Sequence, residues 1–442
     1  MPEAAEKSST RSPPLWRQML QAGEAMVVGL SDQARLGVLA PHLSPAVEDL
    51  RYAAWRAWGL TQVRLARLVK RPPDRRLVAL LAVAISCLQR QYRDPAVVVD
   101  QSVRAARELG REPAARFVNG LLRRVLADPD AAQADLSEPM AQFNVPLWWH
   151  DRLVADWGLP QAHAILRASQ ARPPLCLRLM GTKVQQQDTQ ARMRAAGLQV
   201  HVHPEDAACV WAHPPRPVQQ IPGFDQGLFR VQDAAAQTLA RHLGPTDASS
   251  SASEVWLDAC AAPGGKTFLM AEQSHRTIWA VDQSSARMAR LETERIRLAD
   301  HLQGAIETRL WDWTQPGSIP GLPAQFDGVV LDAPCSASGV VRHHPEIPWR
   351  QSETALAALV ARQATILDKL WQLLKPGGHC WLITCSVFRA EGEDQATAFQ
   401  ARWPQARRCP SPGHVFPSAE TTAAGMVVGH DGFFHACFEK LA

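Results

Sequence analysis

The sequence predicts a multidomain protein with an all-α N-terminal domain, a small α+β middle domain and a C-terminal α/β Rossmann-like domain. Residues 14–126 repeat Ala, Leu, Arg and Val at intervals of three and four residues, as packed helices do. Residues 172–202 alternate strand and helix patterns over a short span. From Val255 onward, short apolar runs alternate with helical patterns, which is typical of a mostly parallel sheet. A chain of 442 residues has room for two or three such domains.

Composition indicates an ordinary globular protein, since 46% of the residues are hydrophobic and 20% are charged. The formal net charge of +4 is compatible with nucleic acid binding but does not identify it. The charge is unevenly placed, because residues 1–130 carry 20 Lys and Arg against 13 Asp and Glu. We therefore expect a polyanion to bind at the N-terminal part of the chain.

The nine cysteines are odd in number and follow no regular framework, which indicates a reducing compartment. The sequence holds no C-x-x-C pair, and the adjacent His343 and His344 suit no metal site, so we expect no metal. Residues 1–6 are polar and acidic, and no signal peptide follows. No apolar run reaches the roughly 20 residues of a membrane span. These features predict a cytoplasmic protein without a membrane segment.

Proline and aspartate mark the helix starts of the N-terminal region. Pro72-Pro73-Asp74 precedes residues 77–85, which are apolar nearly all round and are predicted to be buried. Asp94-Pro95 and the segment 111–113 predict the starts of two more helices.

The middle region predicts two strands and two helices. Residues 160–170 predict a helix with proline in its first turn, and residues 184–196 predict a second. Residues 172–180 and 198–202 alternate as strands do. The pair Trp148-Trp149 could stack on bases, but a core position is favoured for it.

Composition shifts suggest the domain boundaries. Residues 1–14 are rich in Ser, Glu and Pro and are expected to form a disordered lead, and residues 127–140 are predicted to form a polar linker. Residues 246–253 form a Ser-rich bridge of no evident function. The predicted domains are 1–140, 141–218 and 219–442.

A glycine turn lies between the first strand and the first helix of the C-terminal pattern. The strand 255–257 is followed by residues 258–267, and a helical pattern starts at Phe268. Backbone N–H groups at such a turn face a ligand, together with the positive helix end. Cys260 stands where a Walker loop needs its first glycine, and no G-x-G-x-x-G occurs, so this is neither of those nucleotide sites.

Two later strands end in residues whose side chains can take part in catalysis. The run 329–336 delivers Asp332 and Cys335, and the run 380–387 delivers Cys385. Because ligands of doubly wound sheets bind at the carboxyl ends of the strands, we expect these three side chains to meet Asp258 in one crevice.

Three segments of the chain closely resemble motifs of the RNA cytosine-5 methyltransferases of the Nop/Sun (RsmB/NOP) family. They are D-A-C-A-A-P-G-G-K-T at 258–267, D-A-P-C-S-A-S-G at 332–339 and T-C-S-V at 384–387. V-Q-D-A-A-A-Q at 231–237 and D-G-F-F at 431–434 also match the family. The resemblance covers nearly the whole chain from about Leu77. It implies a class I S-adenosylmethionine-dependent methyltransferase domain, with S-adenosylmethionine as the cofactor and carbon-5 of a cytosine in RNA as the target.

The segment F-V-N-G-L-L-R-R at 117–124 resembles the last helix of NusB-like RNA-binding domains. Within the family such a domain precedes the catalytic part of the enzymes that act on 16S ribosomal RNA. The resemblance therefore implies that the partner is 16S ribosomal RNA, bound before full subunit assembly, by a monomeric protein. The resemblance also implies that the middle domain faces the RNA.

The resemblance implies a set of residues that hold the cofactor. They are Cys260, Ala261, Ala262, Pro263, Gly264, Gly265, Lys266, Asp282, Asp312 and Asp332. Asp282 ends a predicted strand, near the spacing expected of an acid that binds ribose hydroxyls. Trp311 stands where the family usually has glycine before the acid at 312. Helix capping is the alternative role for the acids at 282 and 312.

The family's catalytic residues match four positions of this sequence. Methylation of carbon-5 needs a thiolate that adds to carbon-6 of the cytosine, and a second group that assists product release. The resemblance makes Cys385 the nucleophile, Cys335 the releasing cysteine and Asp332 the acid that positions the base. Lys266 is expected to assist by lowering the pKa of a thiol. Glu391 matches the family, whereas Gly392 replaces an asparagine, so the support of the active-site loop is expected to differ.

Three other functions stay open at this point. A transfer RNA methyltransferase would use the same residues, and the NusB-like segment argues against it. A non-catalytic RNA-binding ribosome-assembly factor is disfavoured by the complete set of cysteines and acids. A DNA methyltransferase would carry its nucleophile in a Pro-Cys motif, and the additional Thr-Cys cysteine favours RNA.

Overall fold

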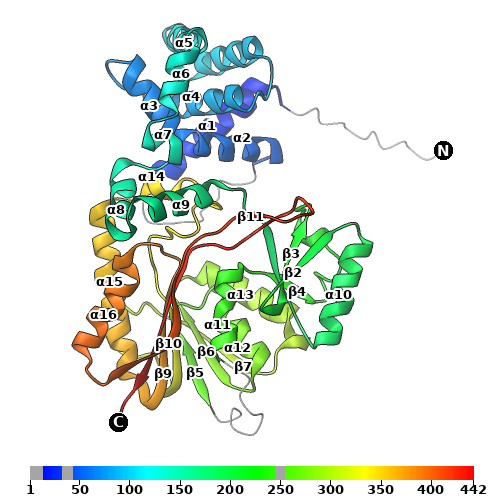
Figure 1. Cartoon of the computed structure of the whole chain (residues 1–442), viewed down its shortest axis with the longest axis vertical. Helices are drawn as coiled ribbons and strands as arrows, with labels where there is room; N and C mark the ends of the chain where they lie inside the picture. The colour runs from blue at the N-terminus through cyan, green and yellow to red at the C-terminus, as the bar shows by residue number, and fades with distance from the viewer. Residues whose placement is uncertain (1–12, 32–42, 244–253) are drawn as a thin grey trace, which may run out of the picture. The chain divides into compact units, whose positions relative to one another are not determined.

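A computed structural model of the protein describes residues 13–31, 43–243 and 254–442 (Figure 1). The chain divides into two compact units. One comprises Met1–Asp151 with Pro345–Gln351, and the other Arg152–His344 with Ser352–Ala442. The predicted Ser-rich bridge and nearly all of the predicted N-terminal lead lie outside the described residues.

The first unit is helical, as predicted. Its helices are α1 (Leu15–Ser31), α2 (Pro45–Arg56), α3 (Trp58–Leu68), α4 (Arg75–Gln89), α5 (Pro95–Ala127), α6 (Pro129–Asp135), α7 (Pro139–Phe143) and α14 (Ile347–Arg350). Asp74 caps α4 by accepting a hydrogen bond from the backbone N–H of Arg76, and Asp94 caps α5 in the same way, with Pro95 in its first turn.

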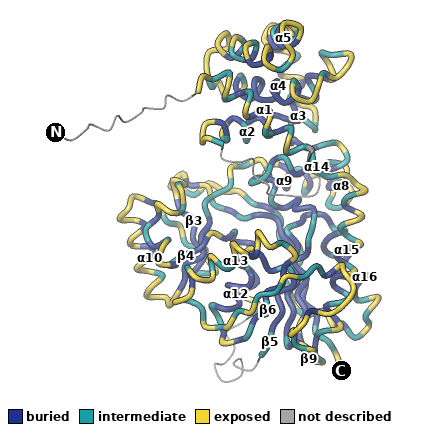
Figure 2. The backbone as a smooth tube through the Cα atoms, turned by 180° about the vertical axis from the view of Figure 1, so that it is seen from behind, coloured by how far each residue is buried: buried dark blue, intermediate teal, exposed yellow. Residues whose placement is uncertain are grey.

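Helix α4 is the centre of the first unit's core. Residues 79–85 are all at most 1% exposed, which confirms the burial predicted from their apolar character (Figure 2). Helices α1, α2 and α5 all contact α4. A helix that is apolar all round is stable in water only when neighbours cover it on every side.

Helix α5 contains a break at the position where the sequence predicts a second helix start. Gly110 and Arg111 leave the helical conformation, and Arg111 has φ +55° and ψ −151°. Pro113 follows in the first turn of the second segment, where its missing N–H costs nothing.

The prediction of a polar linker at 127–140 is wrong. Asp128 caps α6, whose first residue is Pro129, and helix α7 follows. Asp135 is buried and accepts hydrogen bonds from Arg67 at 2.7 and 2.8 Å. A polar composition concealed α6, which is stabilised by the Asp128 cap and by the pairing of Asp135 with Arg67. Helix α7 has only five residues and no side-chain cap.

The second unit contains a four-stranded antiparallel sheet of order β2-β3-β1-β4. Its strands are β1 (Leu175–Leu179), β2 (Gln199–His203), β3 (Asp206–His213) and β4 (Phe229–Val231), with helix α10 (Lys183–Ala195). Helices α8 (Leu147–Trp157) and α9 (Leu159–Gln170) precede it in the chain. Strand β3 was not predicted, and β4 lies beyond residue 218, where the composition suggested a boundary. The predicted boundaries themselves stay predictions.

The larger sheet has seven strands in the order β10-β13-β9-β8-β5-β6-β7. They are β5 (Val255–Asp258), β6 (Thr277–Asp282), β7 (Ala305–Leu310), β8 (Phe326–Asp332), β9 (Leu374–Thr384), β10 (Ala406–Val415) and β13 (Phe433–Lys440). The five strands from β9 to β7 are parallel, and β13 pairs antiparallel with β9 on one side and with β10 on the other. The predicted α/β Rossmann-like class is confirmed, although β10 was not foreseen. A two-stranded ribbon, β11 (Glu420–Thr421) with β12 (Val427–Val428), lies outside this sheet.

Helices cover both faces of this sheet (Figure 1). Those on one face are α11 (Ala234–Leu243), α12 (Gly265–Gln273) and α13 (Ser285–Arg297), and those on the other are α15 (Glu353–Gln372) and α16 (Glu393–Arg402). This three-layer packing buries the central parallel strands β5, β6 and β8 on both sides, as their apolar sequences require, whereas the edge strand β7 contains polar residues and has no buried residue. Within the described ranges, no helix combines the length and the apolar character that crossing a membrane requires.

Candidate active site

Four acidic or sulfur-bearing residues stand at the carboxyl edge of the parallel strands. Asp258 ends β5, Asp282 ends β6 and Asp332 ends β8, while Cys385 directly follows β9. Because these strands are parallel neighbours, their ends meet at one edge of the sheet. The loops after these strands form the candidate site.

The glycine turn connects β5 to the N-terminus of α12. Gly264 has φ +107°, and a Cβ atom there would collide with the ring of Phe268. The backbone N–H of Ala262 donates to Asp282 Oδ2 at 3.2 Å, which ties the turn to the end of β6. Asp282 is itself buried and also accepts a hydrogen bond from Arg287 at 2.9 Å. The turn is therefore held rigidly at the helix end.

Asp258 presents an unpartnered oxygen beneath this turn. Its Oδ2 accepts a hydrogen bond from Thr267 Oγ1 at 2.7 Å, and its Oδ1 has no partner within the described part of the chain. Burial raises the pKa of Asp258 to about 7. A buried acceptor without a partner is a group that a bound molecule can satisfy.

Lys266 and Asp332 form a close ion pair. Lys266 Nζ lies 2.6 Å from Asp332 Oδ2, and its side chain is 7% exposed against 37% for the aspartate. The ammonium also lies 5.5 Å from the centre of the Phe433 ring. The proposed thiol-activating role of Lys266 stays a prediction, because the contact that the structure gives this ammonium is with a carboxylate.

The sulfur atoms of Cys335 and Cys385 lie 3.4 Å apart. Both residues are partly exposed, and each follows the carboxyl end of its strand. The contact with Cys385, together with burial, raises the pKa of the Cys335 thiol well above its usual value. The backbone N–H of Gly339 donates to Cys385 O at 2.9 Å, so the two cysteine loops are also joined through the backbone.

Asp312 lies in a more exposed loop after β7. It accepts hydrogen bonds from the backbone N–H and the hydroxyl of Thr314. Its partial burial acts to raise its pKa, but these hydrogen bonds and the charge of Arg362 lower it overall. The neighbouring Trp313 is buried and donates from Nε1 to Ala259 O. The buried ring of Trp313 thus supports the residue that follows β5.

A buried arginine joins three segments that lie far apart in the sequence. Arg342 donates to Asp431 at 2.5 Å and to Asp233 at 3.2 Å, and His343 Nε2 lies 3.0 Å from Asp431. The single positive charge of the arginine offsets part of the negative charge of the two carboxylates near His343. Sequence patterns could not reveal this network because its members are so widely separated, although the V-Q-D and D-G-F-F motifs each contain one of the carboxylates.

Gly392 lies against His414. A Cβ atom at 392 would collide with the His414 ring and lie 3.0 Å from Phe434. The space that an asparagine would fill is therefore occupied by these two rings, which explains the predicted difference of this loop.

The other cysteines outside the glycine turn lie in or against apolar clusters. Cys87, Cys176, Cys209, Cys380 and Cys437 are buried, and Cys409 is half-buried. Cys260 in the turn is also half-buried, and burial raises the pKa of its thiol. Trp149 is buried as a core residue, whereas Trp148 is half-buried.

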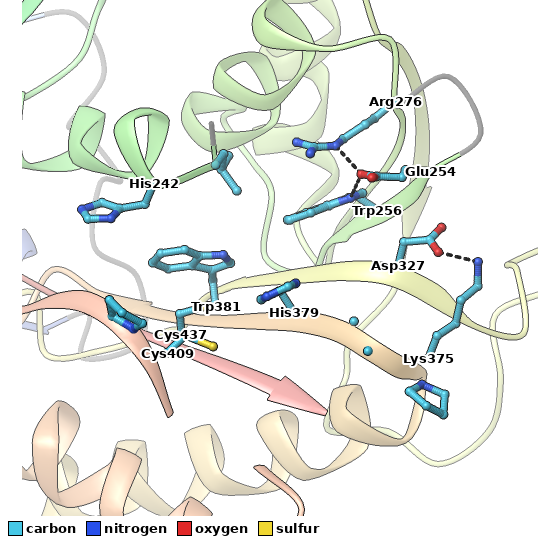
Figure 3. A pocket seen from close by; sticks show the side chains of 15 residues that line it. His242, Glu254, Trp256, Arg276, Asp327, Lys375, His379, Trp381, Cys409 and Cys437 are labelled. Atoms are coloured by element: carbon cyan, nitrogen blue, oxygen red, sulfur yellow. Dashed lines mark hydrogen bonds and ion pairs between the residues drawn. The ribbon is translucent and has the colours of Figure 1, made fainter. Parts of the chain in front are cut away.

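A separate cavity of about 540 Å³ lies near the opposite ends of the parallel strands (Figure 3). Glu254, which precedes β5, pairs there with Arg276 at 2.6 Å, and Lys375 pairs with Asp327 at 2.7 Å. None of the predicted site residues lines this cavity. This cavity is therefore separate from the candidate site at the carboxyl edge.

Sequence comparison finds three family models along the chain. Residues 247–439 match the model of 16S rRNA methyltransferase RsmB/F, residues 145–219 match a ferredoxin-like domain of RsmF/B-like methyltransferases, and residues 26–127 match the NusB family. Ribosomal RNA small subunit methyltransferase B of Cronobacter sakazakii is 31% identical over 88% of this chain and 89% of that protein. The protein of the same name from Xanthomonas campestris pv. campestris is 34% identical over 91% of this chain and 90% of its own.

Solved structures share the fold. The crystal structure of PH0851 has a TM-score of 0.73 at 21% identity, covering 97% of this chain and 100% of that one. The structure of NSun6 from Pyrococcus horikoshii with SFG has a TM-score of 0.54 at 16% identity, covering 67% and 98% of the two chains.

Proposed function

This chain belongs to the RsmB/F family of 16S rRNA methyltransferases, and from that premise we propose that Cys385 carries the methylation of carbon-5 of a cytosine in small-subunit ribosomal RNA. The protein is a methyltransferase that takes its methyl group from S-adenosylmethionine. The observation that carries the proposal is the pair of cysteine sulfurs 3.4 Å apart, next to the Lys266–Asp332 pair at the carboxyl edge of the sheet.

Three features support the turn 260–266 as the place that holds the cofactor. The turn precedes a helix of nine residues, whose N-terminal N–H groups favour a carboxylate such as that of the methionine moiety. Asp258 Oδ1 is a buried acceptor without a partner among the described residues. Asp282 and Asp312 offer carboxylates after the two neighbouring strands, and Asp332 adjoins the turn through Lys266. When bound, S-adenosylmethionine supplies an electrophilic methyl group on a sulfonium sulfur.

The two cysteines divide the covalent chemistry between them. The Cys385 thiolate adds to carbon-6 of the cytosine, and the electron pair of the 5,6 double bond moves to carbon-5, which becomes nucleophilic enough to receive the methyl group. The carbon-5 proton is then removed, and the carbon–sulfur bond breaks as the double bond forms again. The raised pKa of Cys335 keeps it a thiol beside the departing Cys385 sulfur, and this suits a role in release. Asp332 would hold the N3 and N4 edge of the ring.

The RNA is proposed to bind through the N-terminal unit. Residues 1–130 contain 20 Lys and Arg but only 13 Asp and Glu, and this excess of positive charge favours contact with phosphates. The natural substrate would be 16S ribosomal RNA before the small subunit is fully assembled, and the protein would act as a monomer in the cytoplasm.

Transfer of a labelled methyl group tests the assignment. Purified protein, S-adenosylmethionine carrying a tritiated methyl group and protein-free 16S ribosomal RNA are expected to give labelled 5-methylcytosine. Cys385→Ala is expected to give none. Label on another base, or full activity in Cys385→Ala, would refute the proposal. Transfer RNA and DNA in parallel reactions separate the alternative substrates.

A further inference from the structure

Glu391 is a fully buried carboxylate that contacts both cysteine loops. It ends the short turn Arg389–Glu391 after β9. Its Oε2 accepts hydrogen bonds from the hydroxyls of Ser386, at 2.7 Å, and of Ser336. Its Oε1 accepts a hydrogen bond from the backbone N–H of Ser336 at 2.8 Å. Ser336 directly follows Cys335, and Ser386 directly follows Cys385.

Further hydrogen bonds extend this connection. Gln363 Nε2 donates to Glu391 Oε1 and to Pro334 O, both at 3.0 Å. Ser338 Oγ lies 2.9 Å from Ser386 Oγ and accepts a hydrogen bond from the backbone N–H of Val387 at 2.9 Å. The residues on either side of both cysteines are thus fixed through one buried cluster, at whose centre lies the carboxylate.

The surroundings suit an ionised carboxylate. Burial raises the pKa of Glu391, and the hydrogen bonds from Ser336 and Ser386 oppose that rise. The backbone N–H of Ser336 and the Nε2 of Gln363 both donate to Oε1, so an amide NH₂ in place of Oε1 would face two donors. An amide NH₂ in place of Oε2 would make each serine hydroxyl turn from donor to acceptor. The pKa of Cys335 is raised mainly by its contact with Cys385 and by burial. The negative charge of Glu391 is a smaller cause that acts in the same direction.

We propose that Glu391 is a positioning residue for the methylation reaction, which fixes the distance between the Cys335 and Cys385 sulfurs by holding Ser336 and Ser386. It acts through these neighbours and does not touch the substrate. The inference rests on the proposed roles of the two cysteines. Its structural basis is the single carboxylate shared by two loops that are separated by 50 residues in the chain.

Glu391→Gln tests the positioning role with the least change in volume. We expect methyl transfer to fall about 100-fold, the scale of loss that follows a displacement of about 1 Å in an active site. The affinity for S-adenosylmethionine is expected to stay unchanged, because the turn 260–266 does not contact Glu391 through any of the hydrogen bonds above. The matched control is Glu393→Gln, two residues on, where the glutamate is exposed and pairs with Arg408. This control is expected to transfer methyl groups at the wild-type rate.

A second readout measures the sulfur geometry without RNA. Diamide oxidises two neighbouring thiols to a disulfide and is itself reduced to the hydrazine. Peptide mapping by mass spectrometry then gives the rate of formation of the Cys335–Cys385 disulfide. We expect this rate to fall at least 10-fold in Glu391→Gln and to be unchanged in Glu393→Gln. Wild-type rates of both methyl transfer and disulfide formation in Glu391→Gln would overturn the proposal.

A variant that removes only two hydroxyls covers the case in which Glu391→Gln does not fold. The double variant Ser336→Ala/Ser386→Ala is expected to slow both reactions in the same direction. Unchanged rates in this double variant would also overturn the proposal. Should the wild-type protein methylate no RNA at all, the proposed function fails, yet the disulfide rate still decides whether Glu391 sets the distance between the sulfurs.

Discussion

Gly392 shows how a departure at one residue is set by its neighbours. Its backbone lies against the rings of His414 and Phe434, and there is no room for a Cβ atom. From the sequence, this glycine could be recognised only as a residue that replaces the asparagine usual in the family. The reason could not be predicted, because His414 is 22 residues away and belongs to a strand, β10, that the sequence pattern did not reveal.

Gly392→Ala is therefore expected to destabilise the protein. The added methyl group must displace the His414 ring, and overpacking of this kind costs about 1–3 kcal/mol. Urea unfolding of the variant and of Gly120→Ala as a control would measure the free energies, since at 120, within helix α5, a Cβ atom meets nothing within 4 Å. Alanine at this helical position brings neither crowding nor backbone strain. A free energy of unfolding in Gly392→Ala no lower than in the control would contradict the crowding at 392.

His435 is a buried histidine whose ring nitrogens both lack a hydrogen-bond partner among the described residues. Burial lowers its pKa to about 3, with the charge of Lys266 adding to the effect. Between about pH 3 and 6.5 the unfolded chain binds more protons here than the native protein does. The stability contributed by His435 is therefore present above about pH 6.5 and is lost as the pH falls towards 3.

His435→Phe is expected to remove this acid sensitivity. Between pH 7 and pH 5 the variant should lose about 2 kcal/mol less unfolding free energy than the wild type, since each pKa unit corresponds to about 1.4 kcal/mol. Urea unfolding at the two pH values measures the difference. Parallel losses in both proteins would show that the ring at 435 does not govern this part of the pH dependence.

At the scale of elements, the sequence pattern predicted the helices and strands that are stabilised by local capping or that consist of an uninterrupted apolar run. Helix α4 and the central parallel strands β5, β6 and β8 carry largely apolar sequences and were found where they were predicted. Strand β10 contains Arg, Pro and Gly, and its register with β13 shifts between Cys409 and Gly413, so neither composition nor alternation marks it. Helix α6 was hidden by polar residues, of which Asp135 pairs with Arg67 on α3, and the five-residue helix α7 is too short to show a helical period.

The break in α5 is an element whose strain can be tested. Arg111 has φ +55° and ψ −151°, a conformation that only glycine adopts readily. Arg111→Gly is expected to raise the free energy of unfolding by about 1 kcal/mol, the strain relieved less the cost of glycine flexibility. Arg111→Ala keeps its Cβ atom and should bring no such gain. Thermal unfolding that places the glycine variant at or below the alanine variant would argue against a strained break.

At the scale of the whole molecule, the sequence motifs predicted that the proposed catalytic residues share one edge of the sheet, because parallel strands bring their ends together. The motifs did not reveal the connections across it, such as those through Glu391 and Arg342, since these join residues far apart in the chain. The NusB-like segment predicted the character of the first unit, but not that residues 345–351 from the second half of the chain complete it.

RNA binding by the first unit has a measurable signature in salt. Arg116 and Arg123 are exposed on α5, and we expect both to bind phosphates. Replacing both by alanine should reduce the slope of log affinity against log salt by about 0.7–0.9 for each phosphate that is no longer neutralised. Filter binding of 16S ribosomal RNA fragments over a range of salt concentrations gives the slope. Arg192→Ala on α10, where the arginine pairs with Asp188, serves as a control for general charge. An unchanged slope in the double variant would exclude these two arginines from the interface.

The most direct test of the central claim separates the two cysteines by their covalent products. Each variant is mixed with S-adenosylmethionine and 16S ribosomal RNA fragments and run on a denaturing gel. If Cys385 attacks carbon-6 and Cys335 assists release, Cys335→Ala remains joined to the RNA and gives a slow-migrating band, whereas Cys385→Ala gives none. A band from Cys385→Ala instead, or from neither variant, would contradict the assignment of the nucleophile to Cys385.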